Sequence, residues 1–120
     1  MIEGDPGDTA VVAQVAALAV ERAPVVAVFD LIHTHAHVTK ELRSLAPLVT
    51  VGSYAVVLDT VMEDLPAEMF EGRPYGKGNN PGTAVRAFLA GDARWEADPQ
   101  FEDRVLLTLA PGGFLRRRSA

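Results

Sequence analysis

The sequence contains no cysteine, which excludes disulfide bonds, a catalytic thiolate, cysteine-ligated zinc and iron–sulfur clusters. No apolar run comes close to the roughly 20 residues that a membrane-spanning helix needs, so we expect no membrane span. The first residues, 1–5, lack the basic and apolar regions of a signal peptide. The sequence therefore predicts a cytoplasmic protein.

Basic charge is scarce as well. The formal net charge is −5 at pH 7, and the one basic cluster, 116–118, lies at the end of the chain. Binding nucleic-acid phosphates requires clustered lysine and arginine, so we expect no nucleic-acid partner. The common catalytic motifs are missing too: there is no G-x-G-x-x-G, phosphate-binding loop, G-x-S-x-G or H-E-x-x-H.

What is present is an ordinary globular composition. Hydrophobic residues make up 48% of the 120 residues and charged residues 22%. A chain of this size is long enough to form one hydrophobic core. No repeat or linker divides the sequence, so we expect a single domain over 1–120.

The order of the apolar segments predicts an α/β fold. We expect helices over 8–22 and 35–45 and strands over 25–29 and 53–58. Both strands are continuous apolar runs, which is typical of strands buried on both faces of a parallel sheet. Alternating helices and strands indicate crossovers that cover the sheet with helices. The expected buried helix positions are Val12, Val15, Leu18, Ala19, Val38, Leu42 and Leu45.

The second half of the chain continues with a loop, a helix and strands. Residues 63–80 are rich in glycine, proline and asparagine, which predicts a long loop. Asn80 can cap a third helix that begins with Pro81. Residues 95–97 and 105–109 predict two short strands that pair antiparallel at the sheet edge. A turn over 111–113 then returns the chain to the core.

Two aspartates mark a candidate site. Asp30 closes the first predicted strand and Asp59 closes the second. The carboxyl ends of adjacent parallel strands lie on one rim of the sheet, where ligands bind. Two carboxylates there can hold a hard cation such as Mg²⁺. The alternative is that both aspartates only cap turns.

Three histidines follow the first aspartate at alternate positions, His33, His35 and His37. In a strand this spacing could chelate zinc, but at a helix start it splays the side chains apart. The alternative is that some of them simply cap or line the helix. His33 stays near Asp30 and is a candidate general base. The segment 76–80 resembles a phosphate loop only in composition, and a substrate lid or an ordinary loop fits it better.

The ordered motifs of the chain resemble those of a known family. They are Phe29-Asp30, His33 to Val38, Glu41-Leu42, Ala46 to Val49, Gly52 to Tyr54, Val57 to Thr60, Arg73 to Gly76, Gly78 to Pro81, Thr83 to Val85 and Ala110 to Leu115. In this order they resemble the cephalosporin hydroxylase/rhamnosyl O-methyltransferase family, over nearly the whole chain.

The resemblance implies a class I S-adenosylmethionine-dependent O-methyltransferase with a divalent cation such as Mg²⁺ near the methyl acceptor. It implies that Asp30 and Asp59 are metal ligands, with Thr60 beside them, and that Asp30 also contacts the cofactor. In the more distant catechol O-methyltransferase group a lysine stands at the position of His33, which supports His33 as the base. Asp5 lies in a segment similar to the one near the cofactor's adenosine. The implied acceptor is a sugar or small-molecule hydroxyl.

The chain departs from the family pattern in two ways. Leu31 and Ile32 replace a polar pair, and Leu58 stands where some relatives have glutamate. The chain also resembles only the carboxyl-terminal part of a Rossmann-like sheet, without its first two strands and glycine-rich cofactor loop. We therefore expect an exposed edge on strand 25–29, covered by a second copy of the chain, another partner or a strand at Met1–Glu3.

Three functional hypotheses follow. In the first, the chain holds the metal and acceptor half of a methyltransferase site and is impaired or inactive alone. In the second, it is a non-catalytic remnant that acts as an oligomerisation or binding module. In the third, the histidines His33, His35 and His37 form the zinc site of a hydrolase.

Overall fold

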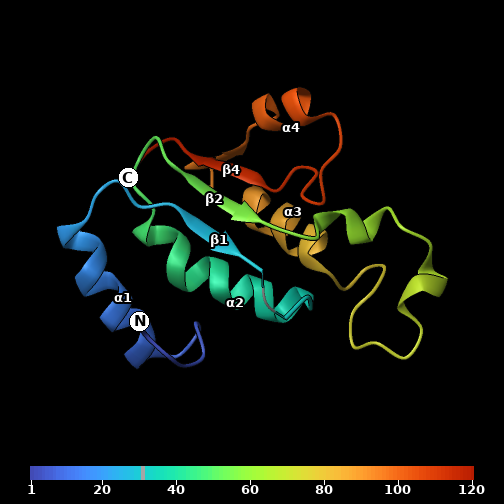
Figure 1. Ribbon diagram of the computed structural model, residues 1–120, viewed down its shortest axis with the longest axis horizontal. Helices are drawn as coiled ribbons and strands as arrows, with labels where there is room; N and C mark the ends of the chain where they lie inside the picture. The colour runs from blue at the N-terminus through green and yellow to red at the C-terminus, as the bar shows by residue number, and fades with distance from the viewer. Residues whose placement is uncertain (31) are drawn as a thin grey trace.

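The computed structural model describes residues 1–30 and 32–120 and has an α/β architecture (Figure 1). A four-stranded mixed sheet and four α-helices make up the described chain. In chain order the elements are α1 (Thr9–Glu21), β1 (Ala27–Phe29), α2 (His35–Leu45), η1 (Ala46–Leu48), β2 (Tyr54–Val57), η2 (Thr60–Glu63), η3 (Ala67–Phe70), α3 (Pro81–Gly91), β3 (Trp95–Ala97), α4 (Gln100–Val105) and β4 (Phe114–Arg117), with the η elements as 3₁₀ turns.

The sheet has the strand order β1-β2-β4-β3. β1 pairs parallel with β2, with Ala27 opposite Ala55 and Phe29 opposite Val57. β4 runs antiparallel to both of its neighbours, β2 and β3. Three strands therefore point one way and one returns, which confirms an α/β fold with a mixed sheet, in which only β1 and β2 pair parallel.

The predicted strand over 105–109 is wrong. Val105 ends helix α4, and the segment after it is a loop in which Leu106 and Leu107 are 91% and 90% exposed. Acidic residues in the first turn of α4 favour its helical dipole, and the Glu102 carboxylate accepts a hydrogen bond from the backbone N–H of Gly112. The strand that pairs with β3 is β4, where Leu115 is fully buried.

One face of the sheet is covered by α2 and α3, which pack against each other (Figure 1). Both helices start at the expected residues because their N-terminal caps are strong. Thr34 accepts a hydrogen bond from His37 N–H at the start of α2, and Asn80 forms a capping box with Thr83 at the start of α3. The core between these helices and the sheet consists of Phe29, Val38, Leu42, Ala46, Val49, Ala55, Val57, Ala84, Val85, Trp95 and Leu115.

The opposite face is covered only in part. Phe101 of α4 packs edge-on against Tyr54, with ring centroids 5.2 Å apart, and also contacts Phe114. Farther along the same face, Val26 and Val28 are 55% and 63% exposed. The prediction that the first strand is buried on both faces is therefore wrong, because in the described chain helices reach this face only over β2 and β4.

The N-terminal region lies beside this sheet rather than in it. Within the described chain Met1–Glu3 forms no strand, so the expectation of a strand there beside β1 is wrong. Asp8 caps α1 by accepting a hydrogen bond from Ala10 N–H. All residues of α1 are described, and none of them is buried, the predicted core positions Val12, Val15, Leu18 and Ala19 included. None of the described helices combines the length and apolarity that crossing a membrane requires.

We expect Leu42→Ala to lower the free energy of unfolding by about 2–5 kcal/mol, because it leaves a cavity where a fully buried side chain packs between α2 and the sheet. Leu107→Ala removes the same atoms from a side chain that is 90% exposed, and we expect a change within about 0.5 kcal/mol. Urea denaturation followed by circular dichroism measures both. Equal effects would show that the core is placed incorrectly.

Candidate functional site

Three titratable side chains meet at the carboxyl ends of β1 and β2. Asp30 follows β1 directly and Asp59 lies two residues after β2, so the parallel pairing of these strands brings them to one rim. His33 joins them, with Nε2 2.8 Å from Oδ2 of Asp59. One ligand atom from each of these three residues lies within 4.8 Å of the other two. The proximity expected from the sequence is present, and the roles of these residues remain predictions.

This Asp30–His33–Asp59 cluster has the donor set of a cation site. His33 Nε2 is buried and makes no hydrogen bond within the described chain, although the Asp59 carboxylate lies close to it. The side chains of His33 and Asp59 are about a quarter exposed, so the cluster is partly shielded from water. Two carboxylates and one imidazole suit a divalent cation. The residues present therefore fit the metal that the sequence predicts.

Thr60 is placed differently from the two aspartates. Its side chain is buried, and its hydroxyl donates a hydrogen bond of 2.8 Å to the backbone carbonyl of Pro111. This bond ties η2 to the turn before β4. A role of Thr60 as metal ligand remains a prediction.

The other two histidines lie apart from this cluster. His35 Nδ1 is 2.9 Å from the hydroxyl of Thr83 on α3, and His37 Nε2 is 3.5 Å from the Glu41 carboxylate. Both belong to α2, whose helical geometry splays them as expected. The structure does not bring His33, His35 and His37 together, and the hypothesis of a three-histidine zinc site has no geometric support.

An aromatic side chain from the long loop packs against His33. The edge of the Tyr75 ring meets the His33 ring, with centroids 5.2 Å apart and an interplanar angle of 65°. Arg73 donates a hydrogen bond of 2.9 Å to the Tyr75 hydroxyl, and the Phe70 ring packs edge-on with the Tyr75 ring, with centroids 6.2 Å apart. The sequence analysis missed Tyr75 and Arg73 as site residues. Their available signal was the motif Arg73 to Gly76 inside a loop too long to be a simple connection.

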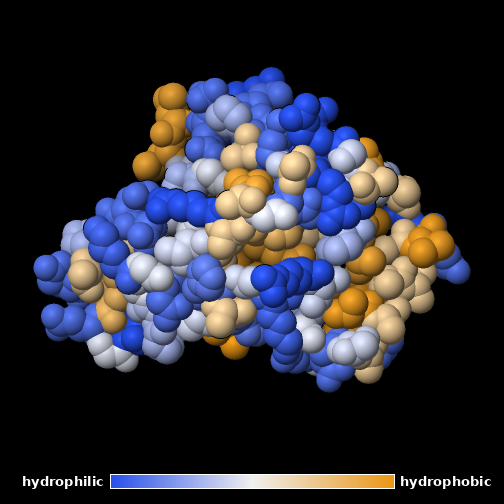
Figure 2. Space-filling model, turned by 180° about the vertical axis from the view of Figure 1, so that it is seen from behind, coloured by the Kyte–Doolittle hydropathy of each residue, from blue (hydrophilic) through white to orange (hydrophobic). Residues whose placement is uncertain are grey.

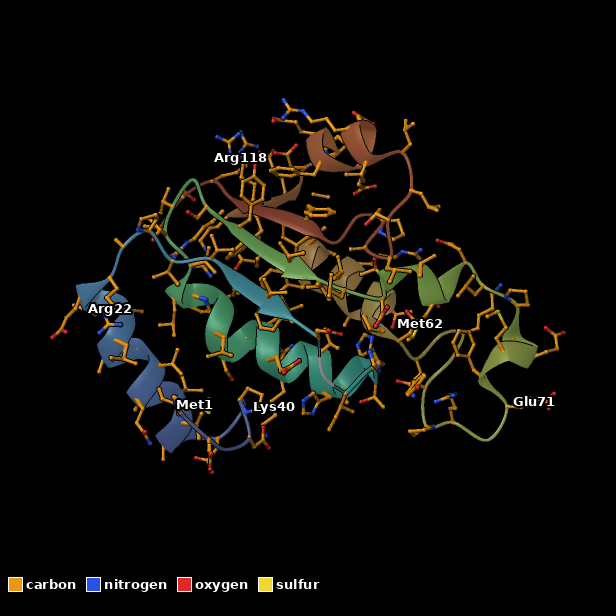
Figure 3. The ribbon with its side chains drawn as sticks, in the orientation of Figure 1. Met1, Arg22, Lys40, Met62, Glu71 and Arg118 are labelled. Atoms are coloured by element: carbon orange, nitrogen blue, oxygen red, sulfur yellow. The ribbon has the colours of Figure 1, made fainter. Side chains whose placement is uncertain are left out.

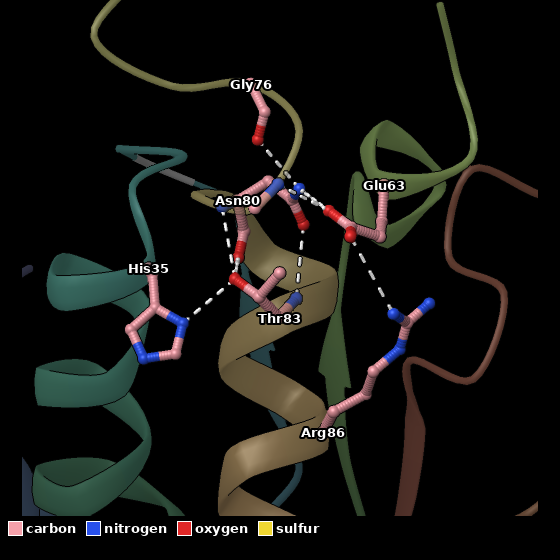
Figure 4. A network of polar contacts seen from close by, with 7 residues as sticks. His35, Glu63, Gly76, Asn80, Thr83 and Arg86 are labelled. Carbon is pink, nitrogen blue, oxygen red and sulfur yellow. Dashed lines mark hydrogen bonds and ion pairs between the residues drawn. The ribbon is translucent and has the colours of Figure 1, made fainter. Parts of the chain in front are cut away.

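A buried hydrogen-bond network anchors this loop at both of its ends (Figure 4). Asn80, which is fully buried, donates through its side-chain amide to the Glu63 carboxylate and to the backbone carbonyl of Gly76. Glu63 also accepts a hydrogen bond of 2.8 Å from Gly78 N–H, and Arg86 lies 3.9 Å from its other oxygen. Asn80 thus joins η2, the loop and the start of α3 at one point.

The same network reaches α2. The Thr83 hydroxyl contacts His35, and the backbone N–H of His35 donates to the Asn79 side chain at 2.9 Å. The segment that carries His33 is therefore fixed relative to the loop that carries Tyr75.

A separate cavity lies between the N-terminal segment and α2. It has a volume of about 410 Å³ and is lined by Gly4, Asp5, Pro6, Ile32 and His37. Lys40 reaches across to Asp5, 3.1 Å away, from its position on α2 (Figure 3). The hydrogen bond from Gly7 N–H, and then that from Lys40, lowers the pKa of Asp5. The cavity is mostly apolar with one carboxylate at its edge.

Glu41 is a buried acid that the sequence analysis treated only as part of a motif. Its side chain is 1% exposed, and neither carboxylate oxygen makes a hydrogen bond to the described chain. Burial raises the pKa of Glu41, although the neighbouring His37 opposes the shift. This carboxyl therefore binds a proton more readily than an exposed glutamate does.

The sequence departures fall at the rim of these sites. Ile32 is 54% exposed and lines the cavity beside Asp5, and Leu58 directly precedes Asp59. Leu31, the other apolar replacement, lies outside the described residues.

A family model described as rhamnosyl O-methyltransferase/CmcI matches residues 1–118 of the chain. No curated protein and no solved structure matches it. The match covers both the three-residue cluster and the loop that carries Tyr75.

We expect Glu63→Gln to lower the free energy of unfolding at neutral pH by on the order of 1 kcal/mol, because a neutral amide accepts weaker hydrogen bonds from Gly78 and Asn80. These two bonds lower the pKa of Glu63 in the folded state from its ordinary value of 4.5. The extra stability is therefore fully present above pH 4.5 and is lost as the pH falls through the folded-state pKa.

Urea titrations of both proteins at a series of pH values measure this difference, which we expect to shrink toward acid pH. Glu68→Gln, at an exposed position of η3, serves as the matched control and should leave the stability unchanged. A difference that stays constant or grows toward acid pH would contradict the charged role of Glu63.

Proposed function

The chain belongs to the rhamnosyl O-methyltransferase/CmcI family, and from this we propose that its Asp30–His33–Asp59 cluster serves metal-assisted methylation of a hydroxyl group by S-adenosylmethionine. The observation that carries the proposal is the meeting of two carboxylates and an imidazole at the ends of adjacent parallel strands. Ligands of open α/β sheets bind at that rim. The parallel pairing of β1 with β2, followed by the antiparallel strand β4, supports the proposal that this sheet corresponds to the C-terminal part of a methyltransferase-like sheet.

The metal would be held by Asp30 and Asp59, whose carboxylates come from two different strand ends. A divalent cation bound there lowers the pKa of a coordinated hydroxyl group. Asp59 has a backbone φ of 57°, a left-handed conformation that is uncommon for residues other than glycine. This conformation turns the chain sharply between β2 and η2.

His33 would take the proton from the acceptor hydroxyl at the ring nitrogen that does not face Asp59, since Nε2 is buried against that carboxylate. The imidazolium that forms would be stabilised by the Asp59 carboxylate at 2.8 Å. The acceptor oxygen can then form its bond to the methyl carbon while the carbon–sulfur bond of the sulfonium breaks. The proton leaves that nitrogen for solvent afterwards, since the His33 side chain is a quarter exposed although its Nε2 is buried.

The acceptor would lie against the wall formed by Phe70, Arg73 and Tyr75. Aromatic rings present apolar faces to the C–H groups of a sugar or small cyclic metabolite, and the guanidinium can donate to its hydroxyls. Tyr75 touches His33, so an acceptor seated on it reaches the proposed base. The loop anchored by Glu63 and Asn80 holds this wall in place.

The adenosine end of the cofactor would lie in the cavity beside Asp5. Ile32 also lines this cavity and follows Asp30 by two residues in the sequence. The apolar lining suits a purine, and a carboxylate can accept a hydrogen bond from its amino group. The 120 residues contain no glycine-rich cofactor loop. We therefore propose that the chain alone binds S-adenosylmethionine weakly and turns over poorly.

We expect the chain to bind Mn²⁺ or Mg²⁺ and expect Asp30→Asn or Asp59→Asn to weaken that binding at least about tenfold, because each removes one charged ligand. Isothermal titration calorimetry, with electron paramagnetic resonance for Mn²⁺, measures the affinity. Asp64→Asn, at an exposed carboxylate after η2, is the matched control. Unchanged affinity in both site variants would refute the cation site.

His33→Ala separates a base from a ligand at the same position. An alanine can neither coordinate a metal nor take the proton of the acceptor, so metal affinity near that of the wild type shows that His33 is not a ligand and supports the base. A loss of metal affinity as large as that of Asp59→Asn would instead assign His33 to the metal.

We expect calorimetry with S-adenosylmethionine to show weak binding that strengthens when Mg²⁺ is present and weakens in Asp5→Asn. The cavity offers one carboxylate and apolar contacts, and its lining residue Ile32 directly precedes His33 of the cluster. Binding that neither metal nor Asp5→Asn affects would place the cofactor elsewhere. No binding up to millimolar cofactor would favour the non-catalytic alternative for this chain.

A further inference from the structure

A hollow lined by arginines lies at the end of the sheet where β2 begins and β4 ends. Its volume is about 130 Å³, and its lining comes mainly from the C-terminal ends of α2, α3 and β4 and from the start of β3. The Asp30–His33–Asp59 cluster lies at the opposite end of β2, so this arginine hollow is separate from the candidate cation site. The charged and aromatic residues of its lining are Arg43, Phe88, Asp92, Arg94, Trp95 and Arg117.

Arg94 is held in the hollow through both its backbone and its side chain. Its carbonyl accepts a hydrogen bond of 2.8 Å from the backbone N–H of Arg118, and its Nε and Nη2 donate to the Asp92 carboxylate at 2.8 and 2.6 Å. The hydrogen bonds from Arg94 lower the pKa of Asp92, and the nearby charge of Arg117 acts in the same direction. Asp92 is therefore ionised at neutral pH, while Nη1 of Arg94 makes no hydrogen bond within the described chain.

Arg117 reaches the hollow from the end of β4. Its Nη1 donates to the backbone carbonyls of Pro47, at 2.7 Å, and Val49, and its Nε donates to the carbonyl of Ser119 at 3.1 Å. These bonds fix the plane of the guanidinium and leave Nη2 without a hydrogen bond in the part of the chain that the structure describes. A guanidinium held in this way can donate to an oxyanion with little further loss of side-chain entropy.

Arg43 supplies the third guanidinium. It is exposed in the last turn of α2, where a cation suits the helix dipole, and it makes neither a hydrogen bond nor an ion pair with the described chain. The helix dipole does not account for the two further arginines beside it. The lining holds three guanidinium groups and one carboxylate, which leaves two positive charges in excess. An anion that carries about two negative charges would balance them.

A second hollow, of about 220 Å³, shares Arg43, Phe88 and Asp92 with the first. Its other lining residues are Ala87 and Gly91, so it offers mainly apolar contacts. Seen from behind, the molecule carries strongly hydrophilic residues directly beside apolar surface (Figure 2), and the two hollows combine the same two kinds of residue. A ligand can therefore place a charged group among the arginines and a small apolar group against Phe88.

We propose that the two hollows together bind the phosphate monoester of a small organic molecule. Such a phosphate carries roughly −1.5 to −2 charge at pH 7, which matches the excess charge of the lining, and guanidinium groups bind its oxygens in bidentate pairs. A carboxylate carries one charge and would leave part of the excess unbalanced. This inference does not depend on the proposed methyltransferase activity, because no residue of either hollow belongs to the Asp30–His33–Asp59 cluster or to the loop that carries Tyr75.

Titration with phenyl phosphate in a buffer of low ionic strength tests the proposal. Trp95 is the only tryptophan of the chain and lines the arginine hollow, so its fluorescence reports binding at this place, and calorimetry measures the affinity. We expect a dissociation constant of about 1 mM or lower, raised at least about tenfold in Arg43→Gln, which removes a charged donor. Arg104→Gln changes an exposed arginine in the last turn of α4 and should leave the affinity unchanged. Absence of binding, or equal weakening by both variants, would overturn the proposal.

Two further ligands test the choice of a phosphate monoester. Benzoate has the same ring with a singly charged carboxylate, and inorganic phosphate has the charge without the ring. We expect each to bind at least about fivefold more weakly than phenyl phosphate, because each lacks one of the two contributions. Benzoate that binds as tightly as phenyl phosphate would contradict the match of charge. Inorganic phosphate that binds as tightly would show that the second hollow holds no part of the ligand.

Discussion

The parallel pairing of β1 with β2 is the interaction on which the rest of this structure depends. It fixes which strand ends lie side by side, and so it brings Asp30 and Asp59 to one rim although they are far apart in sequence. Because β1 has no second neighbour in the described chain, the same pairing also leaves one edge of the sheet free. The candidate cation site is therefore a direct result of this strand placement.

Local sequence signals predicted the helices better than the strands. Thr34 and Asn80 fix the starts of α2 and α3 through bonds to residues three positions away, which sequence alone can indicate. Strand pairing depends on distant residues, and an apolar run such as Val105 to Leu109 does not show whether a partner exists. Here that place in the sheet belongs to β4, whose Leu115 reaches the core.

The residues of the candidate site that the strand topology positions could be predicted from the sequence. The residues that only tertiary contacts position could not. Asp30, His33 and Asp59 follow strand ends, so a parallel sheet is enough to place them together. Tyr75 reaches His33 only because a loop folds back, and nothing in its local sequence fixes that path. The prediction that Val28 is buried was wrong for a related reason. An apolar run indicates that its side chains favour burial, but it does not show which element packs over them.

The hydrogen bond between Asn80 and Glu63 has a consequence for how much the loop between them can vary. The loop starts and ends at the same point, because the residues that flank it are held to each other. Its length and composition can therefore change without moving β2 or α3, since closing a longer loop costs little additional entropy. The loop can therefore vary in length and composition without displacing the cluster of Asp30, His33 and Asp59.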